Sequence, residues 1–572
     1  MIGPRTPAPD KIRIEGERKT AIETGRNRLI VAGAVFAAAF TLIAARVVDV
    51  AMLTESTEPT LTRSVAKDER SSGRAEIVDR NGVLLATSLR TASLYANPQL
   101  VLDPEQAAEK LASVLPDVDK DDIERKLRTD RGFIWLRRHL TPRQQYAVNR
   151  LGIPALNFQH EERRIYPLGP LASHVLGFTD IDNRGIAGVE RYFDKELRIR
   201  RTGIELSLDV RVQHVLRHEL GLAMQKHSAI GAAGLVMDVD SGEVIAMVSL
   251  PGFDPNQPGE IAEDLRFNRT TLGVYEMGST FKIFTTAMAL DAGTVKLSGG
   301  YDATDPIRIA RFVIRDYHAK KRWLSVPEIF MYSSNIGSVK MALDVGVEGH
   351  RSFLRHLGLL KPVSIELSEI GAPLAPNRWR DINTMTISFG HGLAVSPLHL
   401  VSGVSAIVNG GVYRSPTLIK RKPGETVRGT RVVSEETSMK MRRLMRLVVE
   451  QGTGKKAAAE GYLVGGKTGT AEKVSGHGYK RKALISSFIA AFPMNRPRYV
   501  VLAMLDEAKG TKDTFGYATG GWVAAPVIGE VVRRIAPVLG VDPVDEASDE
   551  IQNLLSVKIS GKAGREQRVA NH

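Results

Sequence analysis

The longest apolar stretch of the chain lies close to its N-terminus. Residues 29–45 (LIVAGAVFAAAFTLIAA) carry no charge, and Arg46 is followed by a second apolar run. A helix that crosses a bilayer needs about 20 mostly apolar residues, so the pattern predicts a transmembrane anchor over residues 29–50, with the Arg46 side chain reaching the interface. Basic residues crowd the segment before it, whereas the next one after Arg46 is Arg63. This asymmetry predicts a cytoplasmic tail over residues 1–28 and an extracytoplasmic location for everything after the anchor.

A cleaved signal peptide is the alternative interpretation of the same segment. Small residues at 37–39 would suit a cleavage site. The apolar run is long for a signal peptide, and no other anchor follows it, so a retained anchor is favoured.

Residues 54–225 alternate short apolar and charged segments. The stretch GRAEIVDRNGVLLATS (73–88) predicts two strands joined at Asn81–Gly82, which is a strong hairpin signal. Helices are predicted at 104–115 and 142–151, because each segment follows an N-cap residue and begins with proline. No catalytic constellation is evident in this region, so we expect a spacer or docking module.

Residues 226–540 mix helical and strand periodicities. The stretch 234–249 predicts another hairpin, and 279–293 predicts a buried helix with Gly293 at its C-terminal cap. Further strands are predicted at 461–473, 483–493 and 498–506. Helices intermixed with antiparallel strands indicate an α+β domain. Residues 541–572 are charged and rich in small residues, which predicts a flexible tail.

Composition limits the chemistry that the chain can carry. A length of 572 residues suggests about three domains. The chain has no cysteine, which removes disulfides, thiol nucleophiles and thiolate metal sites. The net charge of +14 could indicate a nucleic-acid partner, but no recognition helix, zinc finger or aromatic–basic motif supports one. A solvated basic surface is therefore expected.

Two local patterns suggest nucleotide binding and metal binding, but each lacks the structural context that such a site needs. GYLVGGKT (461–468) satisfies the phosphate-loop pattern, which works only if a helix begins at its lysine; here Gly469 follows, and the loop interior favours a strand. His214 and His218 are four residues apart on a predicted helix, a spacing that could hold a metal, but no third ligand is evident. We therefore expect no nucleotide, no metal and no other cofactor.

The pattern Ser-x-x-Lys occurs twice, as Ser64–Lys67 and as Ser279–Lys282. Only the second pair follows a glycine and opens an apolar helix. Three residues are about one helical turn, so the lysine would share a face with the serine, and the helix start would favour developing negative charge. A lysine that is partly buried loses its proton more readily and can act as a base.

Two further motifs follow this pair in a fixed order. Ser333-Ser334-Asn335 is the only Ser-x-Asn in the chain, and the KTGT segment 467–470 is also unique. Ser-x-x-Lys, then Ser-x-Asn, then Lys-Thr-Gly is the signature of the penicillin-binding protein and serine β-lactamase superfamily. The chain therefore resembles this superfamily.

The resemblance extends over residues 70–535. GRAEIVDRNGVLLATS and the segment 163–197 resemble the N-terminal module of class B, monofunctional penicillin-binding proteins. The segments 389–411 and 516–531 resemble later parts of their transpeptidase domain. The resemblance implies an antiparallel sheet flanked by helices over residues 226–540, preceded by an α+β pedestal or dimerisation-type module over residues 54–225 and a single transmembrane helix.

The compact N-terminal module is similar to that of the division-specific type, the septal peptidoglycan D,D-transpeptidases. By this resemblance, Ser279 would attack the carbonyl of the penultimate D-alanine of a donor stem peptide, and Lys282 would take the serine proton. Ser333 would relay protons toward the leaving group, and Asn335 would orient Lys282 and the substrate amide. An amine of a second stem peptide would then resolve the acyl-enzyme.

The same resemblance assigns the KTGT strand to substrate binding. Lys467 would place positive charge near Ser333 and the substrate carboxylate, which the hydroxyls of Thr468 and Thr470 would bind. Gly469 would let the substrate backbone approach an edge strand closely. Backbone N–H groups of Ser279 and Thr470 would form the oxyanion hole.

The expected partners also follow from the resemblance. They are stem peptides ending in D-Ala-D-Ala, β-lactams as covalent inhibitors, and in the plasma (inner) membrane a polytopic glycosyltransferase with other division proteins. An elongation-type transpeptidase, a β-lactamase or D,D-carboxypeptidase, and a non-catalytic division scaffold remain as alternatives. The class A lactamase pattern has Ser-Asp-Asn and a deacylating glutamate, whereas Ser334 stands at the middle position here and no such glutamate is identifiable.

Overall fold

The computed structural model describes residues 12–48, 73–199, 202–309, 312–422, 424–475, 478–557 and 559. The chain divides into two units, residues 1–72 and 73–572.

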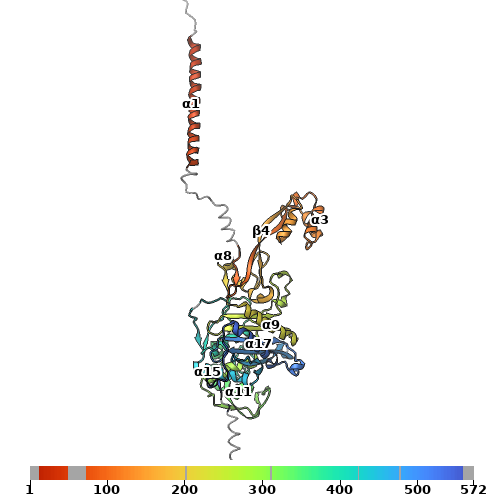
Figure 1. The fold of residues 1–572 in the computed structure, drawn as a ribbon, viewed down its shortest axis with the longest axis vertical. Helices are drawn as coiled ribbons and strands as arrows, with labels where there is room; N and C mark the ends of the chain where they lie inside the picture. Colours follow the sequence, from red (N-terminus) through yellow and green to blue (C-terminus); the bar gives the residue numbers. More distant parts are fainter. Residues whose placement is uncertain are drawn as a thin grey trace, which may run out of the picture. The chain divides into compact units, whose positions relative to one another are not determined.

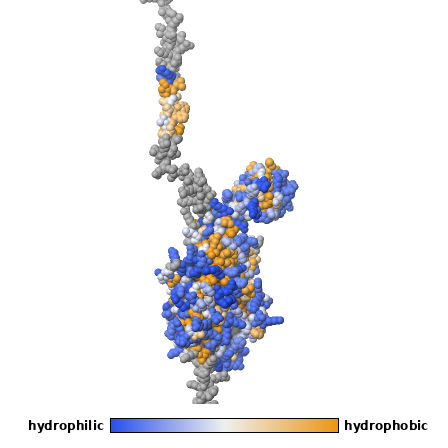
Figure 2. Space-filling model, in the orientation of Figure 1, coloured by the Kyte–Doolittle hydropathy of each residue, from blue (hydrophilic) through white to orange (hydrophobic). Residues whose placement is uncertain are grey.

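The first unit contains one long helix, α1 (Ile12–Val48), which bears the predicted anchor (Figure 1). Its segment Arg26–Ala45 has a mean hydropathy of 2.1 and is long and apolar enough to cross a membrane. Apolar side chains such as Leu29 and Phe36 are exposed along it, and the coloured part of this helix is largely orange in Figure 2. An apolar segment of this length suits a lipid environment.

The second unit begins with the predicted hairpin. Strand β1 (Ile77–Val78) pairs with β2 (Leu84–Ala96), and the turn between them contains Gly82 at φ +82°. The Asp79 carboxylate accepts N–H hydrogen bonds from two residues of this turn, each at 2.8 Å. The hairpin predicted from Asn81–Gly82 is therefore confirmed, although β2 continues well beyond residue 88.

The rest of this N-terminal module packs helices against long strands. The two predicted helices are confirmed, with N-caps at Asp103 and Thr141. Their apolar faces close a core around the fully buried Leu94 and Leu111. The elements are β3 (Ile134–Leu140) and β4 (Leu156–Ile165), which both pair with β2, and α3 (Pro104–Val114), α4 (Lys120–Leu127) and α5 (Pro142–Asn149).

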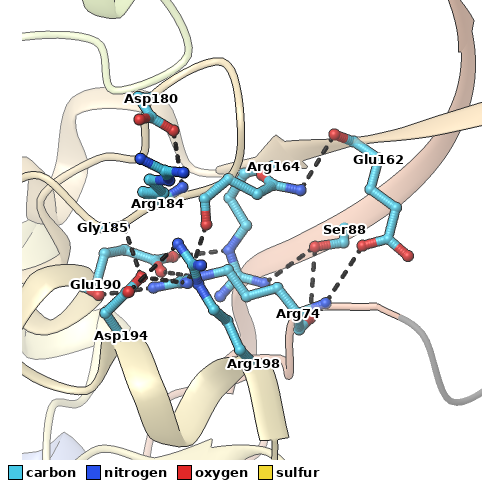
Figure 3. A network of polar contacts seen from close by, with 11 residues as sticks. Arg74, Ser88, Glu162, Arg164, Asp180, Arg184, Gly185, Glu190, Asp194 and Arg198 are labelled. Atoms are coloured by element: carbon cyan, nitrogen blue, oxygen red, sulfur yellow. Dashed lines mark hydrogen bonds and ion pairs between the residues drawn. The ribbon is translucent and has the colours of Figure 1, made fainter.

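A buried ion network joins the two ends of this module (Figure 3). Arg74, just before β1, and Arg164, at the end of β4, donate to opposite oxygens of the Glu190 carboxylate at 2.6 and 2.7 Å. Arg74 also pairs with Asp194 at 2.7 Å. Glu190 lies on α7 (Gly188–Tyr192) and Asp194 on α8 (Asp194–Ile199), so one carboxylate connects strands to helices that are far apart in the sequence.

The larger part of the unit is built on a five-stranded antiparallel sheet in the order β16-β17-β18-β6-β7. Its strands are β6 (Gly231–Asp238), β7 (Val244–Leu250), β16 (Gly465–Ser475), β17 (Gly478–Phe492) and β18 (Tyr499–Asp506). Leu235 of β6 joins one core and its neighbour Val236 joins another, so helices cover both faces. The strand β16 forms an edge, as predicted for the KTGT segment.

The two faces carry different helices. Helices α9 (Val210–Lys226) and α17 (Ala525–Val538) lie side by side against one face (Figure 1). The other face packs against α14 (Pro397–Val408), and α10 (Lys282–Asp291) packs against α14 in the same core. The predicted α+β class, an antiparallel sheet flanked by helices, is confirmed.

Further helices and short strands complete the unit. They are η3 (Gly169–Ala172), α6 (Ser173–Leu176), β5 (Ile204–Glu205), β8 (Tyr275–Glu276), η6 (Gly278–Phe281), β9 (Gly300–Asp302), β10 (Ile307–Ile309), β11 (Phe312–Ile314), β12 (Trp323–Ser325), α11 (Val326–Tyr332), α12 (Asn335–His356), α13 (Asp381–Ile387), β13 (Ala394–Val395), β14 (Val412–Tyr413), β15 (Thr430–Arg431), α15 (Glu435–Glu450), α16 (Gly520–Val523) and α18 (Asp549–Leu555).

The prediction of a flexible tail from residue 541 is wrong for its first part. Helix α18 buries Ile551 and Leu555, which are four residues apart and so share one face. Arg446 of α15 pairs with Glu546 at 2.6 Å. Two apolar residues at helical spacing therefore order a segment whose average composition is polar. Residues 560–572 lie outside the described part of the chain.

Candidate active site

The predicted nucleophile and base lie at the start of one helix. Ser279 belongs to the 3₁₀ turn η6, which continues directly into α10 at Lys282. The predicted helix 279–293 thus begins with a tighter turn. The Lys282 Nζ lies 2.9 Å from Ser279 Oγ. The serine is partly exposed, whereas the lysine is 1% exposed.

Close backbone packing fixes this turn against the edge strand. Gly278 has φ +54°, and a Cβ atom there would lie 2.5 Å from the carbonyl oxygen of Thr470. Gly278 also donates its N–H to the carbonyl of Gly390 at 3.2 Å. A Cβ at Gly390 would come within 2.0 Å of the Gly278 carbonyl oxygen. Glycine is therefore required where three backbone segments meet beside Ser279.

The Ser-x-Asn motif forms the joint between two helices. Helix α11 ends at Ser333, which adopts the left-handed conformation at φ +61°, and α12 begins at Asn335. Ser334 caps α12 by accepting the Gly337 N–H at 3.0 Å. The sharp turn directs the Ser333 carbonyl, the Ser333 hydroxyl and the Asn335 Oδ1 at Lys282 Nζ, at 2.8, 3.1 and 2.7 Å.

The KTGT strand supplies the second lysine. Lys467 is fully buried on β16, and its Nζ donates to Ser333 Oγ at 2.9 Å. Ser333 is thus in contact with both lysines. The structure brings together Ser279, Lys282, Ser333, Asn335 and Lys467, as the order of the motifs predicted.

Burial lowers the pKa of both lysines, since a buried amine favours its neutral form. For Lys282, burial is the main cause and the positive charge of Lys467 adds to it, while the Asp316 carboxylate acts in the opposite direction; the pKa of Lys282 falls well below its usual range. Burial alone lowers the pKa of Lys467 to about 7. A neutral Lys282 beside Ser279 is able to accept a proton.

The hydrogen-bond partners of Lys282 also favour this role. The Ser333 carbonyl can only accept, and Asn335 must present its oxygen because its Nδ2 donates to the Arg315 carbonyl at 2.9 Å. These two acceptors use the two N–H bonds of a neutral amine. The remaining lone pair is then available to the Ser279 hydroxyl.

The threonines of the KTGT strand differ in their surroundings. Thr468 is 8% exposed and its hydroxyl lies 2.9 Å from the Thr453 hydroxyl. Thr470 is partly exposed and its hydroxyl accepts the Gly520 N–H at 3.1 Å. Thr470 is therefore the more accessible of the two.

Position 469 requires glycine for a structural reason that the sequence did not reveal. A Cβ atom there would lie 2.4 Å from Ser487 Oγ and 2.8 Å from the Met277 carbonyl oxygen. The protein itself fills this space, so the glycine allows the turn before Ser279 to approach β16. The expectation that Gly469 makes room for substrate backbone has no support in this packing.

Asp316 was not found from the sequence. Its carboxylate accepts the Ser334 hydroxyl at 2.7 Å and the Ile336 N–H at 3.0 Å, which holds the start of α12 in place. Thr453 and Gly520, which contact the KTGT threonines, were missed as well. Asp316 and Thr453 lie in no recognisable motif, and the resemblance of the segment 516–531 assigned no role to Gly520. Only the folded chain brings them to the site.

The competing patterns do not form sites. The lysine of the phosphate-loop pattern lies inside strand β16, so no helix begins there. His214 and His218 are exposed on α9, as expected, and no group of metal-ligating side chains occurs among the described residues. Ser64–Lys67 falls outside the described residues.

The transpeptidase domain of penicillin-binding proteins matches residues 232–533. This range contains the Ser-x-x-Lys pair at 279–282, the Ser-x-Asn motif at 333–335 and the KTGT segment at 467–470. The chain belongs to the penicillin-binding protein family. The dimerisation domain of penicillin-binding proteins matches residues 69–219. This penicillin-binding protein therefore pairs the two domains as the resemblance to class B predicted, and the division-specific FtsI type is confirmed by its relatives.

Two curated relatives resemble this penicillin-binding protein along most of their length. It is 43% identical to a probable peptidoglycan D,D-transpeptidase FtsI of Caulobacter vibrioides, with 82% of each chain covered. It is 31% identical to the peptidoglycan D,D-transpeptidase FtsI of Escherichia coli K12, covering 84% of this chain and 86% of the relative. Penicillin-binding protein 3 of Mycobacterium tuberculosis shares its fold, with a TM-score of 0.66, 22% identity, and coverage of 86% and 99% of the two chains.

Proposed function

We propose that this protein is a membrane-anchored, serine-type D,D-transpeptidase that cross-links peptidoglycan stem peptides during cell division. The observation that carries the proposal is the buried Lys282 amine 2.9 Å from the Ser279 hydroxyl. The family membership supports the reaction, and the relatives named FtsI support the role in division.

Acylation begins when Ser279 Oγ attacks the carbonyl carbon of the penultimate D-alanine and Lys282 takes the hydroxyl proton. The carbonyl oxygen becomes an oxyanion, which the N–H groups of Ser279 and Thr470 receive. The C–N bond then breaks as Ser333 passes its proton to the leaving D-alanine nitrogen and receives in turn the proton that Lys282 took, across their 3.1 Å contact. Because Lys467 donates to the Ser333 oxygen, the serine's own hydrogen is free for this transfer.

The acyl-enzyme is resolved by an amine of a neighbouring stem peptide. Lys282, neutral again, removes the amine proton, and a new amide bond forms as the ester bond to Ser279 breaks. Lys282 then returns the proton to Ser279 Oγ, 2.9 Å away. A β-lactam would enter the first half of this cycle, because its ring amide can also be attacked by Ser279. The substrate carboxylate is bound by Lys467 and the hydroxyls of Thr468 and Thr470.

Hydrolysis is the competing reaction, as in a β-lactamase or a D,D-carboxypeptidase. Efficient hydrolysis of the acyl-enzyme needs a base that activates water. In the described part of the chain, no carboxylate is hydrogen-bonded to Ser279 or Lys282. This favours transfer to an amine over transfer to water.

The placement in the cell is part of the proposal. Residues 1–28 are cytoplasmic, 29–50 anchor the chain in the plasma membrane, and the pedestal over 54–225 and the transpeptidase domain over 226–540 lie outside. A polytopic glycosyltransferase and other division proteins in the same membrane are the proposed partners. The basic residues before the apolar segment support this orientation.

Fluorescent penicillin tests the nucleophile directly. Membranes containing the wild-type chain should give a labelled band, Ser279→Ala should abolish it, and Ser113→Ala, an exposed serine of α3, should leave it unchanged. A band that persists in Ser279→Ala would refute the assignment. Label that is lost within minutes from the wild type would favour a hydrolase.

Depletion in cells tests the role in division. Loss of the protein should produce filaments with blocked septa, and Ser279→Ala should fail to rescue them. Swollen, rounded cells would instead indicate an elongation role. Full rescue by Ser279→Ala would show that the protein acts as a scaffold.

A further inference from the structure

A cavity of about 520 Å³ lies on the exposed side of α9, away from the catalytic serine. The turn at residues 168–171, which precedes α6, forms its other wall. This cavity shares no residue with the site around Ser279. None of the described residues that line it is acidic.

Arg217 projects from α9 into this cavity and is half-buried. Its guanidinium packs on the loop after β7, where a Cβ atom at Gly252 would lie 2.9 Å from one terminal nitrogen. Burial lowers the pKa of Arg217, and no neighbouring charge opposes this. No described residue forms a hydrogen bond or ion pair with it, and the nearby Glu219 pairs with Arg534 instead. A charge that is partly withdrawn from water without a partner is unfavourable.

His214 and His218 flank this arginine on the same helix face. Their rings stack at a centroid distance of 6.2 Å and are exposed. No described residue accepts a hydrogen bond from either ring. The two imidazoles can therefore direct N–H groups at a ligand held by the guanidinium.

The remaining lining is largely apolar. Leu168 and Leu171 contribute from the turn, and Leu222, which is 50% exposed, contributes from α9. One permanent positive charge suits a single negative charge, and the planar guanidinium matches a carboxylate in bidentate geometry. A phosphate monoester carries nearly two charges, which one arginine would not neutralise.

We propose that this cavity binds the free α-carboxylate of a short peptide, with Arg217 as the anchor, His214 and His218 as N–H donors, and the leucines around an apolar side chain. The proposal does not depend on the chemistry at Ser279. It gives a function to the histidine pair, which belongs to no group of three metal-ligating side chains among the described residues.

Binding can be measured on the full chain in detergent after Ser279 has been acylated with penicillin, which closes the catalytic cleft. The probes are N-acetyl-alanyl-leucine and the same dipeptide with a C-terminal amide, titrated by calorimetry. The free acid should bind at least about tenfold more tightly than the amide, because a charge-assisted contact is lost in the amide. Arg217→Gln should weaken binding of the acid by a similar factor, and Arg143→Gln, an exposed arginine of α5 with no described partner, should not.

Thermal unfolding separates loss of binding from loss of folding. Because Arg217 has no internal partner among the described residues, Arg217→Gln should unfold at or above the wild-type temperature. Equal affinity for acid and amide, unchanged binding by Arg217→Gln, or a clear drop in its melting temperature would each overturn the proposal. Tighter binding of inorganic phosphate than of the acid would show that the ligand class is wrong.

Discussion

Lys282 has four oxygen atoms within 3.1 Å of its Nζ, and its charged neighbours are Lys467 and Asp316. The protonation state of this lysine is therefore set by its surroundings. A neutral Lys282 and a protonated Lys467 are needed together, so acylation should rise with pH through the pKa of Lys282. It should fall again as Lys467, whose pKa burial lowers to about 7, loses its proton.

Replacing Lys467 tests how this charge acts on its neighbour. Lys467→Met removes a positive charge, so the pKa of Lys282 rises and the acid limb of the pH profile moves to higher pH. The acylation rate at the optimum should also fall by about 10- to 100-fold, since one charge-assisted hydrogen bond is lost. Second-order rates of penicillin acylation between pH 5 and 10 measure both effects. Lys473→Met is the control, because Lys473 lies on the same strand but pairs with Asp506 and Glu507. If the acid limb of the pH profile moved equally in both variants, the charge of Lys467 would not be what lowers the pKa of Lys282.

Asp316 should act in the opposite direction. Its negative charge raises the pKa of Lys282, so Asp316→Asn should lower that pKa further and move the acid limb to lower pH. Looser positioning of Ser334 should reduce acylation by about tenfold, the loss expected for one hydrogen bond. The same pH profiles detect the shift, with the exposed Asp130→Asn as control. If Asp316 only held the start of α12 in place, Asp316→Asn would reduce the acylation rate without moving the acid limb of the pH profile.

The elements that hold these residues were largely predictable. Strong local signals, such as the Asn81–Gly82 turn and the prolines at the starts of α3 and α5, act over a few residues and so can be read in the sequence. The motif order also predicted which side chains meet. The contacts of Asp316 and the packing reason for Gly469 could not be predicted, because both depend on segments that only the tertiary fold brings together.

Contact between the turn η6 and strand β16 is expected to control reactivity. Gly278→Ala would place a methyl group 2.5 Å from the Thr470 carbonyl and separate the two elements. A displacement of about 1 Å can cost about 10²-fold in rate, so penicillin acylation should fall by this order. The measurement is the acylation rate in detergent.

Gly293→Ala is a matched control for this variant. Gly293 lies just after α10 and also has positive φ, but a Cβ atom there would meet no other atom within 4 Å. Both substitutions should cost about 1 kcal/mol in stability through backbone strain. Only the first should impair acylation, and equal loss in both would assign the effect to strain.

In the whole molecule, the ion network around Glu190 joins the pedestal strands to the segment that leads toward the transpeptidase domain. The Gly188 N–H on the same short helix donates to Glu369, at 3.2 Å. The wrong prediction of a flexible tail has a related cause. Besides its two buried apolar residues, the tail is held by Arg446, which pairs with Glu546, and by Arg443, which donates to the Leu554 carbonyl of α18, both about a hundred positions earlier. Such long-range contacts leave little trace in local composition.

Glu190→Gln should destabilise this junction. It leaves Arg74 and Arg164 buried with one carboxylate fewer, and breaking a buried pair in this way typically costs about 3–5 kcal/mol. In thermal unfolding of the full chain, the first transition should occur at a lower temperature than in the wild type. Arg198→Gln should change stability by less than about 1 kcal/mol, because Arg198 is exposed and pairs with Asp194 at 3.3 Å. Similar melting temperatures for the two variants would show that the network contributes little.

Ser333 occupies a backbone conformation that disfavours every residue with a side chain, and it costs the free protein about 1–2 kcal/mol. Glycine would relax that turn and, in the same step, delete the hydroxyl that links the two lysines. Selection for heat resistance and selection for turnover are thus opposed at this one position. A lineage adapting to higher temperature would have to find its extra stability elsewhere in the chain.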